Sequence, residues 1–332
     1  MQPHMFTSGF VYQVIAPAAQ GEPGFVAALV HLGSRLFLLN PALFNLGFAL
    51  IQLIIGGLIL FRATAKVGLV LSLVWGLVVW SLGEAFGGIF STHTLLLMGA
   101  PGAVALYMLI ALAIMPALRG AKKLNHPKYW LVFVWMILWI GGGVYQLLPG
   151  QNTAAGLGSM IAGNASGAPG WLASLDTSVG NWLAGFSGVH AAVAASPNVM
   201  TMGGMVMSSP LPQSPTHPGY AAVLILALIE VAIGMGVLLP GWWRRSAVGL
   251  GMVLSLLFWI VGQDMGAIYS GFATDLNSGP LFMLLGLAVL SVDGLDHQLR
   301  ILGSRIESLL IGQPDQQNAL VVQPADENRL IS

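Results

Sequence analysis

The sequence predicts an all-α, polytopic membrane protein built as a bundle of about seven transmembrane helices. Only 7% of its 332 residues are charged, whereas an ordinary soluble domain has about 25%. Hydrophobic residues make up 56%, the mean hydropathy is +0.81, and several long apolar runs contain no charge. So few charges cannot cover the water-facing surface of a chain this long. This excludes a soluble enzyme, a nucleic-acid-binding protein and a disordered scaffold.

Each predicted span is an apolar run close to the ~20 residues that a helix needs to cross the hydrocarbon core. Helices are expected because water is absent there and backbone amides must find partners within the segment. The last run is the shortest, since Asp293 and Asp296 trim its end. The runs are 44–61, 67–91, 97–118, 129–149, 219–239, 246–270 and 279–295.

Basic residues fall in alternate loops. They follow the first, third, fifth and seventh spans as Arg62, Lys66, Arg119, Lys122, Lys123, Lys128, Arg244, Arg245, Arg300 and Arg305. The other loops, 92–96, 150–218 and 271–278, contain no Lys or Arg. The positive-inside rule then places the N-terminus outside and the C-terminus in the cytoplasm. The N-terminus lacks the basic region of a cleaved signal peptide, so we expect a multi-pass protein of a bacterial plasma membrane.

Two stretches of the chain resemble each other. Residues 49–56 (ALIQLIIG) match 227–234 (ALIEVAIG) at five of eight positions, and 80–91 (WSLGEAFGGIFS) align with 259–270 (WIVGQDMGAIYS). Pro101 then falls opposite Pro280. We predict a first repeat at 44–118, a linker helix at 129–149 and a second repeat at 219–298. Three spans per copy and one linker span give both copies the same orientation. In transporters with such parallel repeats, the site lies between the copies near the midplane.

Three further segments complete the organisation. Residues 1–43 form an outer N-terminal segment, in which 24–38 are expected to form an interfacial helix. The extracytoplasmic loop 150–218 carries one charge, Asp176. A helix at the interface or folded back into the protein is predicted there by the spacing of Leu172, Leu175, Val179, Trp182 and Phe186. Residues 299–332 form a cytoplasmic tail whose polar end is expected to be disordered.

Polar side chains within the spans are the candidate site, because an ionisable group in hydrocarbon is costly and usually faces the bundle interior. We expect them to form helical stripes that bind or translocate a small solute or ion between the repeats, with the carboxylates as proton or ion sites. The alternative is that they only hydrogen-bond between helices and fix packing. The glycine triplet 141–143 predicts a close helix crossing. The candidate residues are Gln52, Trp80, Glu84, Glu230, Trp259, Gln263 and Asp264.

The outer loop also offers a candidate copper site, because imidazole and thioether ligands together suit Cu(I). The alternative is that these methionines are flexible apolar filler. The residues are His190, Met200, Met202, Met205 and Met207. The chain has no cysteine, and we find no phosphate loop, dinucleotide fingerprint or Gly-x-Ser-x-Gly motif, so no catalytic residue is nominated.

Residues 230–247 (EVAIGMGVLLPGWWRRSA) resemble the DoxX-like family of small bacterial membrane proteins. That family carries a Glu in one span, then a Gly- and Leu-rich run, a Gly turn and an Arg. The resemblance implies a non-transporting subunit of a membrane redox or assembly complex, with a membrane or outer-face protein partner or a quinone. The 69-residue loop 150–218 departs from the family pattern. The matching residues are Glu230, Gly234, Leu238, Leu239, Gly241, and Arg244 or Arg245.

Overall fold

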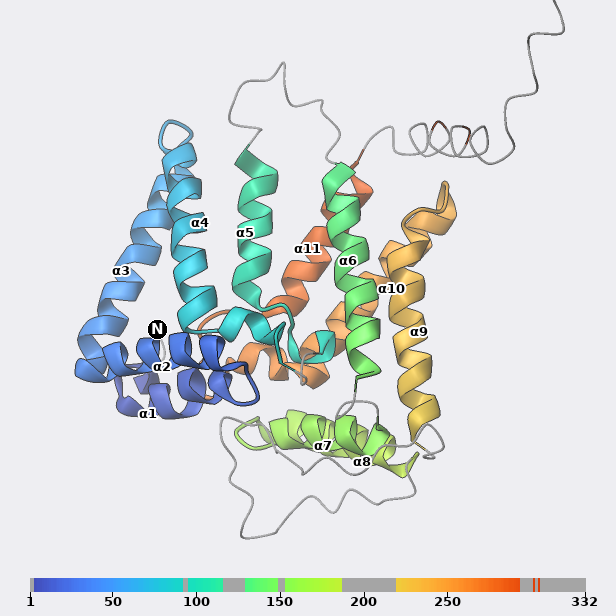
Figure 1. Ribbon diagram of the computed structural model, residues 1–332, viewed down its shortest axis with the longest axis horizontal. Helices are drawn as coiled ribbons and strands as arrows, with labels where there is room; N and C mark the ends of the chain where they lie inside the picture. Colours follow the sequence, from blue (N-terminus) through green and yellow to red (C-terminus); the bar gives the residue numbers. More distant parts are fainter. Residues whose placement is uncertain are drawn as a thin grey trace, which may run out of the picture. The chain divides into compact units, whose positions relative to one another are not determined.

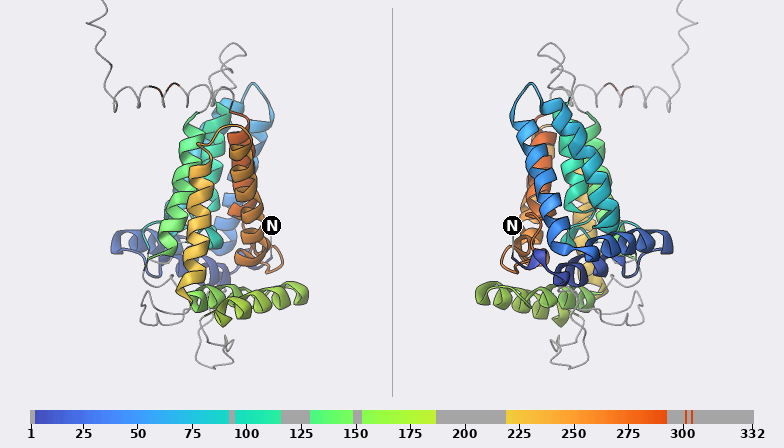
Figure 2. Two further views of the ribbon diagram at one scale, coloured as in Figure 1. Left: turned by 90° about the vertical axis from the view of Figure 1, so that its right-hand side faces the viewer. Right: turned by 90° about the vertical axis from the view of Figure 1, so that its left-hand side faces the viewer.

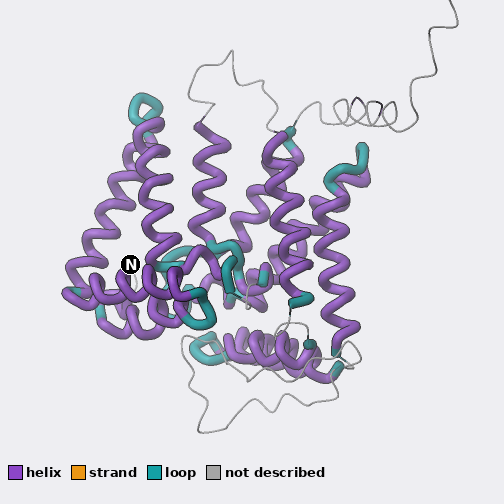
Figure 3. Tube along the Cα trace, in the orientation of Figure 1, coloured by secondary structure: helices purple, strands orange, loops and turns teal. Residues whose placement is uncertain are grey.

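The computed structural model describes residues 3–91, 95–115, 129–148, 153–186 and 219–292, together with Ile301 and Ser304. These residues form helices, turns and loops, with no strand among them (Figure 3). The chain divides into two units, Met1–Val292 and Asp293–Ser332, and every element below belongs to the first. The predicted all-α class is confirmed, whereas the predicted disordered tail lies outside the described residues.

Four helices are long and apolar enough to cross a membrane. They are α3 (Pro41–Leu60), α4 (Ala65–Leu82), α6 (Tyr129–Gln146) and a helix over Trp242–Gly262 that comprises α10 (Trp242–Leu257) and η8 (Phe258–Gly262). Shorter apolar helices run alongside them (Figures 1 and 2), namely α5 (Ala103–Ile114), α9 (Tyr220–Gly236) and α11 (Ser278–Leu290). Each predicted span contains one of these helices.

The outward faces of these helices are apolar. On α3, Leu53 and Leu60 are 70% and 78% exposed, and on α6 Phe133 and Ile137 are 64% and 69% exposed. Contiguous apolar surface of this kind is unfavourable in water and is stable against lipid chains. The exposed side chains therefore agree with a membrane environment.

Close backbone approach packs α6 against α9. A Cβ on Gly143 would lie 2.6 Å from the carbonyl oxygen of Ala227, and one on Gly234 would lie 2.8 Å from Cγ1 of Ile140. Only glycine allows this separation, so Gly143 confirms the predicted close crossing. The indole of Trp135, fully buried, donates a hydrogen bond to the carbonyl oxygen of Ile233 at 3.4 Å across the same contact.

Two groups of short helices lie across the ends of the upright helices (Figures 1 and 2). The α3–α4 and α9–α10 turns lie at the opposite end, at the top of Figure 1. The predicted helices at 24–38 and 172–186 both belong to the cross-lying groups and are confirmed as helices. The groups comprise η1 (Pro3–Phe6), α1 (Ser8–Phe10), η2 (Val11–Ile15), η3 (Ala16–Ala19) and α2 (Gly24–Leu39), and α7 (Ala154–Asn164) and α8 (Gly170–Gly185).

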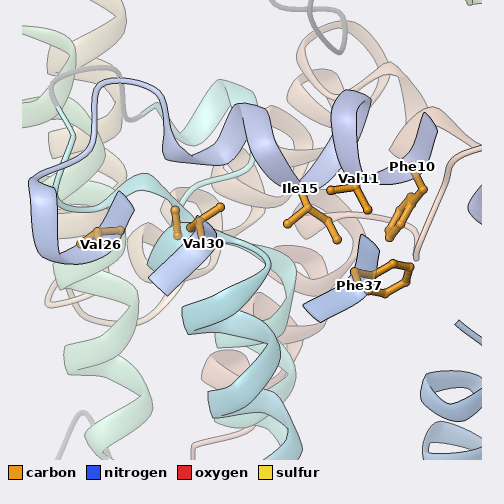
Figure 4. Close-up of a cluster of buried hydrophobic side chains, with 7 residues drawn as sticks. Phe10, Val11, Ile15, Val26, Val30 and Phe37 are labelled. Carbon is orange, nitrogen blue, oxygen red and sulfur yellow. The ribbon is translucent and has the colours of Figure 1, made fainter. Parts of the chain in front are cut away.

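The N-terminal group encloses an apolar cluster of its own (Figure 4). It contains Phe10, Val11, Ile15, Val26, Val30, Phe37 and Ala85. On α8 the buried residues are Leu172, Asp176, Gly180 and Ala184. Of the stripe predicted from helical spacing, only Leu172 is buried, while Trp182 is 64% exposed. The rest of the predicted stripe lies on the outward face of α8. The opposite face carries Gly180 and Ala184, whose small size allows close packing.

Two predicted spans end earlier than expected. The span 67–91 stops as a helix at Leu82, and the span 246–270 stops at Gly262. Each is followed by a single short turn, η4 (Ala85–Gly88) or η9 (Asp264–Ala267). A loop then leads into the next helix. The loop between η4 and α5 contains η5 (Leu96–Met98).

Candidate functional site

The turns η4 and η9 have the same unusual backbone. Four consecutive residues have positive φ in each, with 47°, 57°, 64° and 76° from Ala85 to Gly88 and 46°, 51°, 76° and 52° from Asp264 to Ala267. This left-handed conformation costs roughly 1–2 kcal/mol for each residue that is not glycine. Gly87 has a second role, since a Cβ there would overlap the carbonyl of Pro101. The helices end at Leu82 and Gly262, so the helical stripes predicted from Trp80 and from Trp259 do not continue through these turns.

The residue before each turn holds the start of the following helix. The carboxyl of Glu84 accepts a hydrogen bond through Oε2 from the backbone N–H of Val104 in α5, at 3.4 Å. Gln263 accepts one through Oε1 from the backbone N–H of Gly279 in α11, at 3.0 Å. Side-chain oxygens at these positions satisfy donors that a helix leaves free at its N-terminus.

Trp80 and Trp259 also make matching hydrogen bonds to the loop before the next helix. The indole N–H of Trp80 donates to the carbonyl oxygen of Pro101 at 2.8 Å, and that of Trp259 donates to Leu276 at 2.6 Å. In both halves the acceptor lies in the loop just before the next helix, at its second-last residue. The predicted pairs Trp80 with Trp259 and Glu84 with Gln263 thus have matching local contacts.

The loop between turn and helix is shorter in the second half. Ala85 and Asp264 begin the two turns 179 residues apart, whereas α5 and α11 begin 175 residues apart. Pro101 precedes α5, but Pro280 lies inside the first turn of α11. The alignment of these two prolines, predicted from sequence, is therefore wrong.

Glu84 lies in a carboxyl-rich corner beside this loop. Burial, followed by the charge of Asp275, raises the pKa of Glu84 to about 8, while the bond from Val104 opposes the shift. Burial also raises the pKa of Asp275, against hydrogen bonds from Asn277 and Thr274. A Cβ on Gly102 would overlap the Glu84 carboxyl, so the loop backbone closes over it. Glu84 is thus a capping residue whose carboxyl, with its raised pKa, is mostly protonated at neutral pH.

Glu230 has different surroundings. It is fully buried on α9, where its Oε1 accepts a 2.5 Å hydrogen bond from Nε2 of Gln146 on α6. Oε2 of Glu230 and Oε1 of Gln146 are also buried, and neither has a hydrogen-bond partner among the described residues. Two acceptor oxygens remain at this pair, so a proton on the carboxyl or a donor on a ligand would satisfy them.

A groove of about 690 Å³ opens between α4, α5 and α6. Its two polar side-chain groups are turned to the backbone, since Trp80 bonds Pro101 and the Tyr145 hydroxyl donates to the carbonyl of Ile89 at 2.7 Å. The walls are otherwise apolar and include Leu73, Leu77, Leu96, Ala105, Leu109 and Ile137.

The groove reaches the neighbourhood of Glu230 at Gly142. Gly142 and Leu96 both line the groove. A Cβ on Gly142 would overlap the Leu96 side chain and lie 3.0 Å from Oε2 of Glu230. Leu96 and the carboxyl therefore lie against the same side of Gly142, and the carboxyl is about one side chain away from the groove.

A second pair of carboxyls lies where α8 approaches the end of the long helix. Asp176 on α8 is fully buried, and neither of its oxygens has a hydrogen-bond partner among the described residues. Burial raises the pKa of Asp264 to about 6, and burial together with the charge of Asp264 raises the pKa of Asp176 to about 7. Asn164 anchors α7 here, donating to the carbonyl of Gly262 at 2.9 Å.

The predicted site residues are therefore divided among several places. The Glu84 carboxyl lies against Val104 and Gly102, whereas the Glu230 carboxyl lies against Gln146 and Gly142. Gln52 is exposed on the outer face of α3. The groups missed from the sequence are Gln146, Asp176 and Asp275. Of these, Asp176 is the one charge that the sequence shows in the loop 150–218, although it is not among the site residues predicted from the sequence. His190, Met200, Met202, Met205 and Met207 lie outside the described residues.

Comparisons with known proteins give no relative: no family model, curated protein or solved structure matches this chain. The resemblance of 230–247 to the DoxX-like family consequently remains a prediction from short motifs. Any function has to be argued from the chain's own chemistry.

Proposed function

We propose that this protein binds a small amphipathic molecule, taken from the lipid phase into the groove between α4, α5 and α6, with its polar end at Glu230. The observation that carries the proposal is the position of Gly142, which lines the groove and also lies against the Glu230 carboxyl. The proposal narrows the small solute expected from the sequence to one with an apolar body. Movement of such a solute across the membrane would use the same site.

The volume and chemistry of the groove define the ligand class. A volume of about 690 Å³ lies in the range of small-molecule sites, which are mostly apolar with a few placed polar groups. An apolar chain or ring would fill the groove. A hydroxyl or amine at its end would donate a hydrogen bond to Oε2 of Glu230, displacing the Leu96 side chain. Leaving that buried acceptor unpaired is costly, so such a donor would bind favourably.

The proposal includes seven crossing helices with the N-terminus outside and the C-terminus in the cytoplasm. It is supported by the α3–α4 turn, which carries Arg62, and by the start of α10, which carries Arg244 and Arg245. Both lie at one end of the bundle, opposite α2, α7 and α8 (Figure 1). Since the chain has no cysteine, single cysteines test the orientation. In intact cells an impermeant maleimide should label Ser166→Cys and not Ala63→Cys. The reverse pattern would refute the orientation.

Two parallel repeats are also part of the proposal. They are supported by the matching left-handed turns, the matching caps of Glu84 and Gln263, and the matching indole bonds of Trp80 and Trp259. Under this arrangement α3, α4 and α5 correspond to α9, α10 and α11, with α6 as the linker.

The groove can be filled without disturbing the fold. Gly141 lines it, and a Cβ there would meet no atom within 4 Å. Gly249 on α10 is equally open and lies outside the groove, so it is a matched control. The test uses the purified full-length protein in lipid nanodiscs and a fatty alcohol that carries a diazirine. Photolabelled peptides are then quantified by mass spectrometry.

We expect saturable labelling of α5 and α6 peptides in the native protein. Gly141→Phe should lower it about tenfold, as should Glu230→Leu, which removes the polar contact. Gly249→Phe should leave it unchanged. Labelling that does not saturate, or that Gly141→Phe leaves unaltered in a normally folded protein, would refute the proposal.

A further inference from the structure

The two cross-lying helices α2 and α8 have the same local design. Both have 16 residues, and both begin with a glycine after an N-cap proline, Pro23 or Pro169, in an extended conformation. The third, seventh and eleventh positions of each helix are buried. At the seventh position, α2 has Val30 and α8 has Asp176. The register of the two helices can therefore be compared residue by residue.

In each helix, the seventh residue can be paired with the first residue of a left-handed turn, which is η4 for α2 and η9 for α8. In the first half, Val30 belongs to the same apolar cluster as Ala85, which begins η4. In the second half, α8 packs against η8, which ends at Gly262, and Asp176 lies within electrostatic range of Asp264, which begins η9. An apolar pair in one half is thus matched by two acidic residues in the other.

The fold itself requires neither carboxylate. The left-handed φ of 46° at Asp264 is matched by 47° at Ala85, so alanine tolerates the same backbone conformation. The buried position of Asp176 is filled by Val30 in the other helix, at 0% exposure in both cases. A buried carboxylate with no hydrogen-bond partner is unfavourable, and a second one nearby makes it more so.

The sequence supplies no permanent positive charge nearby along the chain. No Lys or Arg occurs between Lys128 and Arg244 or between Arg245 and Arg300. Both side-chain oxygens of Asp176 and Oδ1 of Asp264 are buried without a hydrogen-bond partner among the described residues, and the Asp176 side chain is fully buried. Two carboxylates from different elements, with no Lys or Arg in the sequence that flanks either of them, are suited to an external cation.

We propose that Asp176 and Asp264 together bind a divalent cation of the Ca²⁺ class. Ca²⁺ prefers carboxylate oxygens, and two of them balance its charge. It also accepts water and backbone carbonyls in irregular geometry, which suits a site between a helix and a turn. The cation would tie α8 to the end of the long helix over Trp242–Gly262, linking the outer helices to the bundle. This site is separate from the groove and does not depend on the proposed function.

The test uses the purified full-length protein, stripped of metal by a chelator and titrated with CaCl₂. Binding to the folded state should raise the Tm by about 3 °C or more at ~1 mM Ca²⁺, and Tb³⁺ luminescence should report the same site. Asp176→Asn and Asp264→Asn should each abolish the shift. Glu22→Gln, which changes an acidic residue of the N-terminal group, should retain it.

The double variant Asp176→Val, Asp264→Ala installs the residue pair of the first half. It should fold, be insensitive to Ca²⁺, and have a higher Tm than the native protein in chelator. A native protein whose Tm does not respond to Ca²⁺ would overturn the proposal, as would a double variant that responds like the native protein. A Tm that depends on pH in chelator and not on Ca²⁺ would instead assign the pair to proton sharing.

Discussion

Glu84 and Gln263 perform the same task at the N-termini of α5 and α11. Each side-chain oxygen accepts a hydrogen bond from a backbone N–H of the next helix, Val104 in one case and Gly279 in the other. Each is followed at once by a left-handed turn. One carboxylic acid and one amide in matching positions indicate that the hydrogen bond matters at both sites, and that the charge does not.

Glu84→Gln should therefore fold normally and keep the labelling of the groove. Glu84→Ala removes the capping oxygen and should lower the free energy of unfolding by about 1 kcal/mol. Denaturation by a graded detergent series, followed by circular dichroism, measures both variants. A loss of stability in Glu84→Gln as large as in Glu84→Ala would show that the charge itself is required.

The pH dependence of stability should reflect Glu84. Its pKa is raised from 4.5 to about 8 in the folded protein, chiefly by burial and next by Asp275. A raised carboxyl pKa means that the folded state binds the proton more tightly, so this contribution is complete at low pH and is lost as pH rises towards 8. The native protein should lose stability over that interval, and Glu84→Gln should lose less. Identical pH profiles would contradict the assignment.

Gln146 should be essential for the stability of the α6–α9 pair. Gln146→Leu leaves the buried carboxyl of Glu230 without its donor and should cost about 1–3 kcal/mol. The double variant Gln146→Leu, Glu230→Leu removes both partners and should recover most of that loss. A double-mutant cycle in the same denaturation assay gives the coupling. Additive losses would show that the hydrogen bond contributes little.

Adjacent glycines of α6 should respond in opposite ways to a side chain. A Cβ on Gly143 would lie 2.6 Å from the carbonyl oxygen of Ala227, so Gly143→Val should destabilise by about 1–3 kcal/mol. Gly141→Ala meets open space and should stabilise by about 0.5–1 kcal/mol through its helix propensity. Thermal unfolding compares the two. Equal effects would refute the close crossing at Gly143.

The sequence predicted the helical class, the location of each apolar helix and the cross-lying segments, because hydrophobic runs and helical spacing are local. It did not predict the turns after Leu82 and Gly262. The residues of these turns are of the same types as those of an apolar helix. Gly87 and Gly266 fit a helix-packing pattern as well as they fit a positive φ. The partner of Glu230 was also missed, because Gln146 is 84 residues away and only the packing of α6 on α9 brings them together.

The predicted site was divided for the same reason. The predicted helical stripes require Glu84 and Gln263 to lie within helices. Instead, each residue directly precedes a left-handed turn, and its side chain accepts a hydrogen bond from the backbone of the next helix. Gln52, aligned with Glu230 in sequence, is exposed on α3, whereas the packing of α6 on α9 buries Glu230. Long-range packing, and not residue type, decides which polar group is buried.

The sharpest test of the proposed groove site is an experimental structure of the full-length protein in lipid nanodiscs. We predict elongated density in the groove between α4, α5 and α6, ending beside Gly142 within hydrogen-bond distance of Oε2 of Glu230, and no such density in Gly141→Phe. A groove filled by protein side chains in the native protein, or density that never approaches Glu230, would contradict it.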